Sequence, residues 1–232
     1  MSMTDPLPIG EPVEFGPVRA PARESLRGSS VLLRPLDPRR DAEQLYAVSH
    51  PPEGDRAIWT YLPAGPYDSV AQMRRALADQ AASEDPLFFT ALLLPDGRPA
   101  GAASYLRITP QFGVIEIGHI WFGAPMQRTT AATEAIYLLA RHAFDELGYR
   151  RLEWKCDALN AASRRAAERF GFTFEGIFRK HMVVKGRNRD TAWYAIVDDD
   201  WPAIRSGFER WLDRSNFDQA GRQRRRLTEL RP

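Results

Sequence analysis

The segment from Gly113 to Asp157 constrains the fold more than any other part of the chain. It begins with an apolar strand pattern, breaks at Pro125, continues as a long helix pattern and ends in a second strand pattern. Apolar residues recur through 131–147 with the spacing of an amphipathic helix, and Gly148 supplies its C-terminal stop. A strand, a helix and a strand in this order predict a right-handed crossover between parallel strands.

Strand and helix patterns alternate on both sides of this unit. They predict further strands at 31–36, 87–94 and 99–108, two strands joined around Gly186, and helices at 40–50, 68–83, 160–171 and 200–213. The turn at 95–97 joins two of the strands as a hairpin. Hairpins mixed with a crossover imply an α/β protein, in which helices cover one sheet.

Composition divides the chain into three parts. Residues 1–29 hold five prolines and little periodicity, which predicts an arm or a disordered lead. Residues 30–214 carry the patterned elements, and 215–232 form a basic C-terminal tail whose stretch 221–232 has five arginines against one glutamate. Because no aromatic residues are interleaved with these arginines, we interpret the tail as a solvated extension. Contact with RNA or the ribosome is the alternative.

The overall composition excludes several classes of protein. Hydrophobic residues make up 44% of the chain and charged residues 27%, as in ordinary globular proteins. No apolar run approaches the roughly 20 residues of a membrane span, and the N-terminus lacks the features of a secretory signal. The single cysteine, Cys156, cannot form an internal disulfide, and no Cys/His spacing indicates zinc. We therefore expect a cytoplasmic protein with no metal.

The start of the helix at 131–147 raises the question of phosphate binding. The free N–H groups of a helix N-terminus bind anions, and in α/β proteins such a helix often follows a strand. Here the loop is Gln127-Arg128-Thr129-Thr130, without the glycines that let a ligand approach the backbone. From this stretch alone, a phosphate-binding loop and an ordinary threonine-capped helix remain equally open.

The stretch DALNAASRRAAERFGFTFEGIFRKH, Asp157 to His181, resembles the end of the GNAT acetyltransferase domain, where Asn-x-x-Ser opens a helix and Gly-Phe-x-x-Glu-Gly opens the next strand. The resemblance is greatest to the Rim-type branch, which acetylates N-termini of ribosomal proteins. It extends from Val31 to about Trp201. It implies the GNAT fold, a mixed, mostly antiparallel sheet of about seven strands that is splayed in the middle and carries helices on both faces.

The resemblance also implies an activity. The chain would be an acetyl-CoA-dependent N-acetyltransferase, in which a primary amine attacks the thioester directly in a ternary complex. The acceptor would be a protein N-terminus or a small-molecule amine, and the branch suggests a homodimer. The competing hypothesis is a non-catalytic CoA-binding module, or a ribosome- or RNA-associated module that uses the arginine-rich tail.

The family's phosphate loop corresponds here to Gln127–Ala132, with Thr130 at the position of the first glycine. Because the donors are backbone N–H groups, Thr130 could serve if its φ is negative, and the closeness of approach to CoA is what the substitution affects. Arg128 could pair with a phosphate or remain solvated. The acetyl-CoA contacts implied by the resemblance are Ile120, Trp121, Phe122, Gln127, Arg128, Thr129, Thr130, Ala131, Ala132, Asn160 and Ser163.

Two residues are candidates for the chemistry. Glu116 stands eleven residues before Gln127, where several superfamily members carry a general base; its alternative role is an ion pair with Arg107. Ser163 matches the serine that holds the thiol sulfur in the Rim-type branch, whereas Ala167 replaces the tyrosine that protonates the thiolate elsewhere in the family. By strand parity His119 should point away from Glu116 as a structural histidine, unless a bulge changes the parity.

The acceptor side is predicted less sharply. The loop between the first two helices contains Trp59, Tyr61 and Tyr67, which by resemblance cover the acceptor, although such aromatic residues could equally anchor the loop in the core. His181 is a further candidate for acceptor binding. Met182 stands where Rim-type relatives can place a carboxylate, which weakens the transfer of a ribosomal-protein substrate to this chain.

Overall fold

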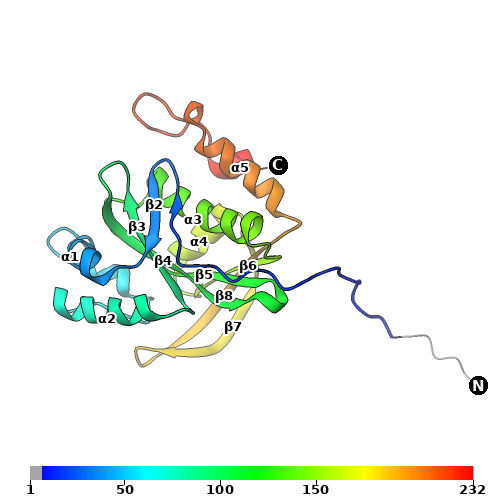
Figure 1. Ribbon diagram of the computed structural model, residues 1–232, viewed down its shortest axis with the longest axis horizontal. Helices are drawn as coiled ribbons and strands as arrows, with labels where there is room; N and C mark the ends of the chain where they lie inside the picture. The colour runs from blue at the N-terminus through cyan, green and yellow to red at the C-terminus, as the bar shows by residue number, and fades with distance from the viewer. Residues whose placement is uncertain (1–6, 232) are drawn as a thin grey trace, which may run out of the picture.

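The computed structural model describes residues 7–231 and contains one eight-stranded sheet (Figure 1). Its strands are β1 (Leu26–Arg27), β2 (Val31–Pro35), β3 (Leu87–Leu93), β4 (Arg98–Thr109), β5 (Val114–Phe122), β6 (Arg151–Asp157), β7 (Thr173–Val184) and β8 (Arg187–Val197). Their order is β1-β2-β3-β4-β5-β6-β8-β7, and only β5 and β6 pair in parallel. The predicted α/β class and mostly antiparallel sheet are confirmed, with the short β1 as an additional strand.

Helices cover both faces of the sheet. They are α1 (Pro38–Ser49), α2 (Val70–Ala82), α3 (Thr130–Arg141), α4 (Ala161–Phe170), α5 (Trp201–Leu212) and the short α6 (Leu227–Leu230). On β3 the neighbouring residues Phe88 and Phe89 point to opposite faces, so Phe88 packs in the core under α1 and α2, and Phe89 in the larger core under α3. Within residues 7–231, no helix is both long and apolar enough to cross a bilayer.

The crossover helix α3 is the most deeply buried helix of the fold. Its buried residues occur on every side because α3 lies between the sheet and α5, where Tyr137 packs against Trp201 and Phe208. The predicted helix through 147 is α-helical only to Arg141, and a π-helical turn, His142–Glu146, completes it.

Over residues 7–25 the N-terminal segment forms no helix. Residues 7–14 are exposed and extend away from the domain (Figure 1), and the chain meets the domain from Phe15, whose ring centre lies 5.9 Å from the Arg150 guanidinium carbon. The N–H of Val18 donates to the carbonyl of Pro110 at 3.3 Å, the guanidinium of Arg19 donates to the carbonyl of Glu146, and Leu26 is buried in β1 beside β2. Residues 1–6 of the predicted arm lie outside the described residues. The proposed division at residues 29 and 214 remains a prediction.

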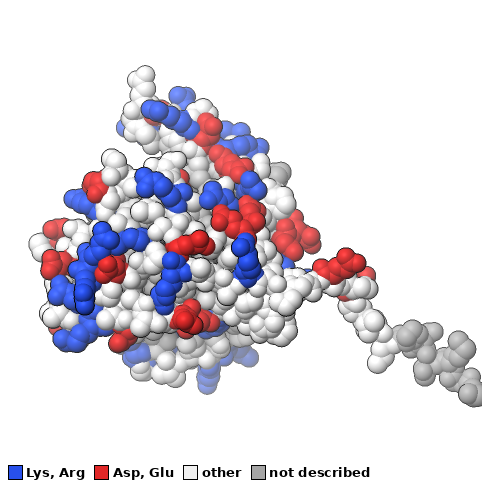
Figure 2. Space-filling model, in the orientation of Figure 1, with Lys and Arg blue, Asp and Glu red and all other residues white. Residues whose placement is uncertain are grey.

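The prediction of a solvated C-terminal extension was wrong. Leu227 and Leu230, three residues apart on α6, are 0% and 6% exposed and belong to the larger core. The buried Asn216 amide donates to the carbonyls of Trp211 and Arg225 at 3.1 and 3.2 Å, which fixes the segment to the end of α5. The arginines stay at the surface, and positive and negative side chains are interspersed on the face drawn in Figure 2.

Candidate functional site

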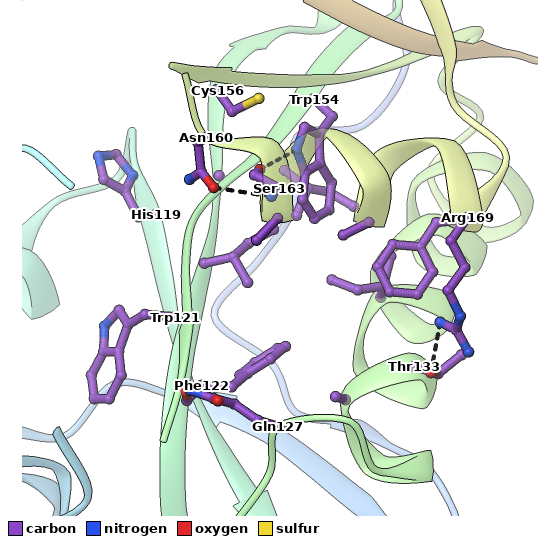
Figure 3. A pocket seen from close by; sticks show the side chains of 18 of the residues that line it. His119, Trp121, Phe122, Gln127, Thr133, Trp154, Cys156, Asn160, Ser163 and Arg169 are labelled. Atoms are coloured by element: carbon purple, nitrogen blue, oxygen red, sulfur yellow. Dashed lines mark hydrogen bonds between the residues drawn. The ribbon is translucent and has the colours of Figure 1, made fainter. Parts of the chain in front are cut away.

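A cavity of about 1210 Å³ opens where β5 and β6 separate. The two strands pair only over Val114–Ile117 and Arg151–Trp154, so beyond these residues the sheet is split. Residues of both strands, the start of α3 and one side of α4 line the cavity (Figure 3), and the segment after α5 completes the lining. We call two of its regions the helix end, with Arg128, Thr129, Thr130, Thr133 and Arg169, and the strand end, with Arg107, Glu116, His119, Lys155 and Arg189.

The helix end presents free backbone donors. Thr129 caps α3, because its Oγ1 accepts from the N–H of Ala132 at 3.3 Å and donates to the carbonyl of Met126 at 2.6 Å. The N–H groups of Thr130 and Ala131 donate to no acceptor among residues 7–231. Open donors at the N-terminus of a twelve-residue helix are chemically suited to binding an anion.

The loop before α3 has the backbone conformation that a threonine at position 130 requires, namely a φ at Thr130 that is not positive. Thr130 is the first residue of α3 and has no positive φ, whereas Arg128 adopts a φ of 60°. The position that needs left-handed backbone is therefore Arg128 and not the threonine that replaces glycine. Gln127 is held to the strand, since its Nε2 donates to the carbonyl of Phe122 at 2.7 Å. Ala131 is buried and is not among the residues that line the cavity, so what it can offer an anion is its backbone N–H.

Ser163 lies at the opening of α4 with its hydroxyl oriented by a neighbour. Asn160 caps this helix, accepting from the N–H of Ser163 at 3.0 Å, and Trp154 Nε1 donates to Ser163 Oγ at 3.0 Å (Figure 3). The Ser163 oxygen accepts from the indole, so its own proton can be donated, and the Cys156 sulfur lies within its hydrogen-bonding reach. Burial raises the pKa of the neighbouring Cys156, which keeps that residue a thiol and makes it a weak nucleophile.

Glu116 is the one carboxylate of the strand end. It is 3% exposed, and its Oε2 lies 2.5 Å from Arg107 Nη1 and 3.0 Å from Lys155 Nζ. Lys155, whose side chain is also 3% exposed, contacts Glu153 at 2.6 Å. Burial raises the pKa of Glu116 above the usual glutamate range, and the two cations oppose that shift. The ion pair considered as the alternative role is thus present, and the group still lines the cavity.

The parity prediction for His119 was wrong because β5 contains a bulge. Ser104 pairs with Gly118 whereas Ala102 pairs with Trp121, so β5 has one extra residue there, and His119 adopts a φ of 49°. His119 lines the same cavity as Glu116, with its Nδ1 3.0 Å from Ser104 Oγ. Burial, followed by the charges of Arg107 and Arg189, lowers its pKa, so the imidazole is neutral near pH 7.

Only one of the three loop aromatics reaches the cavity. Tyr61 lines it and donates from its hydroxyl to the carbonyl of Leu159 at 3.3 Å. Trp59 and Tyr67 are buried in the core under α1 and α2, where they pack edge to face at 5.3 Å, so the core-anchor interpretation describes them. His181 also lies outside the lining; its Nδ1 is 2.9 Å from Thr191 Oγ1.

Several cavity residues were missed from the sequence. Lys155 lines the cavity. It alternates with buried apolar residues along β6, as does Glu153 outside the lining, and this charged strand face could have been recognised in the sequence. Arg189 on β8 lines the strand end, and within the described chain its buried Nε has no hydrogen-bond partner. Arg169 and the segment after α5 had no local motif, since only the packing of distant helices brings them to the cavity.

The cavity thus brings a helix N-terminus and a hydroxyl to a split between two parallel strands. The acetyltransferase (GNAT) domain matches residues 30–173, and the chain belongs to this family of N-acetyltransferases, which transfer an acyl group from acetyl-CoA. The resemblance found in the sequence is thereby confirmed.

Known proteins similar to this chain agree with that assignment. YdaF of Bacillus subtilis, named as a ribosomal N-acetyltransferase, is 27% identical over 74% of this chain and 93% of its own length, in keeping with the Rim-type branch. The crystal structure of a GCN5-related N-acetyltransferase from Brucella melitensis is 44% identical, with a TM-score of 0.90 over 94% of this chain and 98% of the other. The microcin C7 self-immunity acetyltransferase MccE, in complex with acetyl-CoA and AMP, shares the fold at 22% identity with a TM-score of 0.61, covering 73% of this chain and 93% of its own.

Proposed function

We propose that this chain transfers the acetyl group of acetyl-CoA to a primary amine by direct attack in a ternary complex. The observation that carries the proposal is the arrangement of the cavity. Open N–H groups of Thr130 and Ala131 at the start of α3 suit the donor's pyrophosphate, and the Ser163 hydroxyl faces the gap between β5 and β6 where the thioester would lie.

The chemical steps give one role to Glu116 at the strand end and one to Ser163 on α4. The ammonium form of the acceptor loses its proton to Glu116, directly or through a water, and the free amine forms the C–N bond. The nitrogen gives up its second proton to water as the C–S bond breaks. Ser163 donates its hydrogen bond to the departing thiolate, and water completes the protonation. The raised pKa of Glu116 supports its role as base, because a proton acceptor works best when its pKa approaches the operating pH.

The acceptor is proposed at the level of a primary amine. The names of similar proteins point in different directions, to ribosomal acetylation for YdaF and to microcin self-immunity for MccE. An RNA-binding role has only the exposed arginines of the tail in its favour, since the apolar residues of the tail are buried in the core. A protein N-terminus and a small-molecule amine therefore both belong to the proposal.

The test begins with donor binding, measured by the shift in melting temperature. Acetyl-CoA and desulfo-CoA should both stabilise the protein, by about 2.7 kcal/mol at a hundredfold excess over Kd, while ATP should give a much smaller shift. An amine screen with release of free CoA thiol then measures transfer. Absence of any shift with either CoA compound at millimolar concentration would refute the proposal.

A further inference from the structure

The segment after α5 forms one wall of the cavity. Trp211, Phe217, Gly221, Arg222 and Gln223 line it, and we call them the outer wall. All five lie beyond residue 173, where the match to the family domain ends. The wall is therefore a feature of this chain outside the part that defines the family.

Specific contacts hold the outer wall together. Trp211 Nε1 donates to Gln223 Oε1 at 2.8 Å, and the ring of Phe217 meets Trp211 edge to face at 5.3 Å. Phe217 and Gln223 also form a backbone bridge, and the turn between them is closed by Asp218, whose carboxylate accepts from the N–H of Arg222 at 2.8 Å. The turn thus carries Arg222 at the edge of the cavity.

The outer wall faces the cation of the helix end. Arg169 donates from Nη1 to Thr133 Oγ1 at 3.1 Å, and its guanidinium carbon lies 5.2 Å from the centre of the Trp211 ring (Figure 3 shows Arg169 and Thr133). None of the salt bridges found across residues 7–231 includes Arg169 or Arg222.

The charge of this region favours an anion. The carboxylates that line the cavity are Glu116 and Asp157, and both belong to the split strands rather than to the outer wall. Burial, followed by the charge of Arg231, lowers the pKa of Arg169, as expected for a cation that has no carboxylate beside it. Arginine binds phosphate through its planar array of donors, which suits a phosphate monoester.

We propose that Arg169 and Arg222 bind the 3′-phosphate on the ribose of acetyl-CoA, and that Trp211 and Phe217 provide the apolar surface beside its purine. The inference rests on the proposed acetyl-CoA donor. Thr133 lies about one helical turn along α3 from Thr130. A donor whose pyrophosphate occupies the start of α3 can therefore carry its ribose phosphate to Arg169.

The test compares the binding of acetyl-CoA with that of 3′-dephospho-acetyl-CoA by isothermal titration calorimetry. The wild-type protein should prefer acetyl-CoA by about tenfold or more, the effect of one charge-assisted phosphate contact. Arg222→Gln should reduce that preference to below about threefold and leave the affinity for the dephospho compound unchanged. Arg169→Gln should reduce the preference in the same direction.

Arg224→Gln is the matched control, because Arg224 is exposed on the same segment but does not line the cavity. It should keep the full wild-type preference. Equal binding of the two compounds by the wild type, or an unchanged preference in Arg222→Gln, would overturn the inference and leave the proposed function standing. Binding of neither compound would instead refute the proposed function.

Discussion

The two ends of the cavity are built in different ways. At the helix end, the cap and the open N–H groups come from Thr129, Thr130 and Ala131, which are consecutive in the chain. At the strand end, Glu116 meets Arg107 from β4 and Lys155 from β6, so its environment depends on how three strands pair. The helix end can therefore be recognised in a short motif, whereas the strand end exists only in the folded sheet.

Lys155→Met should have the largest effect, because it leaves Glu116 and Glu153 buried without their shared cation. Removing one partner of a buried ion pair costs about 3–5 kcal/mol. Because Glu116 keeps Arg107 and Glu153 keeps Arg151, we expect a loss at the lower end of that range in the free energy of unfolding measured with urea. Arg98→Met is the control, since Arg98 pairs with Asp96 at the surface and should lose less than about 1 kcal/mol. Equal losses in the two variants would mean that the strand end is held no more firmly than a surface pair.

Glu116→Gln should come next, lowering kcat by at least about a hundredfold while the Kd for acetyl-CoA stays within threefold. Wild-type activity should rise with pH as Glu116 loses its proton, above the ordinary glutamate range because burial raises its pKa. Glu153→Gln is the matched control, since Glu153 contacts Lys155 but does not line the cavity. An equal loss of kcat in this control would contradict a chemical role for Glu116. Retained activity in Glu116→Gln together with loss in His119→Gln would assign the base to His119.

Thr129→Val tests the helix end with a smaller effect. Loss of the cap should lower the free energy of unfolding by about 1 kcal/mol. It should also weaken acetyl-CoA binding in calorimetry, because the first turn of α3 would no longer be held in place by the hydrogen bond to Thr129. Ser69→Ala removes the corresponding cap of α2, where Ser69 Oγ accepts from the N–H of Gln72. It should cost similar stability and leave the Kd unchanged. Equal Kd values for acetyl-CoA in the two variants would mean that the cap of α3 does not contribute to donor binding.

Thr130→Gly should have the smallest effect. Thr130 already has helical backbone, so the family's glycine is not needed for the conformation of the loop. Glycine destabilises a helix by about 1 kcal/mol, and we therefore expect the Kd for acetyl-CoA to change by less than about fivefold. A much larger gain in affinity would show that the threonine side chain holds the donor away from the backbone.

Local patterns predicted the parts of the fold that depend on neighbouring residues. The strand, helix and strand of 113–157 appear in the predicted order, and Asn160 and Gly171 cap α4 at its two ends as expected. Spacing could not reveal the bulge at His119, because the three residues after it, Ile120 to Phe122, are all apolar and so show no alternation that an inserted residue could disturb. That residue decides which side chains share the cavity.

Contacts between distant segments account for the other differences. The sequence could not separate Tyr61 at the cavity from Trp59 and Tyr67 in the core, since all three lie in one loop. The many arginines of the tail led to the prediction of a solvated segment. Leu227 and Leu230 are nevertheless buried, and their burial fixes the segment to the domain. Composition describes what a segment exposes, and a few apolar residues can decide where it packs.

The separation of β5 and β6 also divides the sheet mechanically. Strands β1 to β5 and strands β6 to β8 are joined only through the paired lengths Val114–Ile117 and Arg151–Trp154. Backbone groups past these lengths have no neighbouring strand across the gap, so their amides should exchange with deuterium faster than those inside each half. A ligand that fills the gap would bridge the halves and slow exchange in both, which makes the sheet itself a reporter of occupancy.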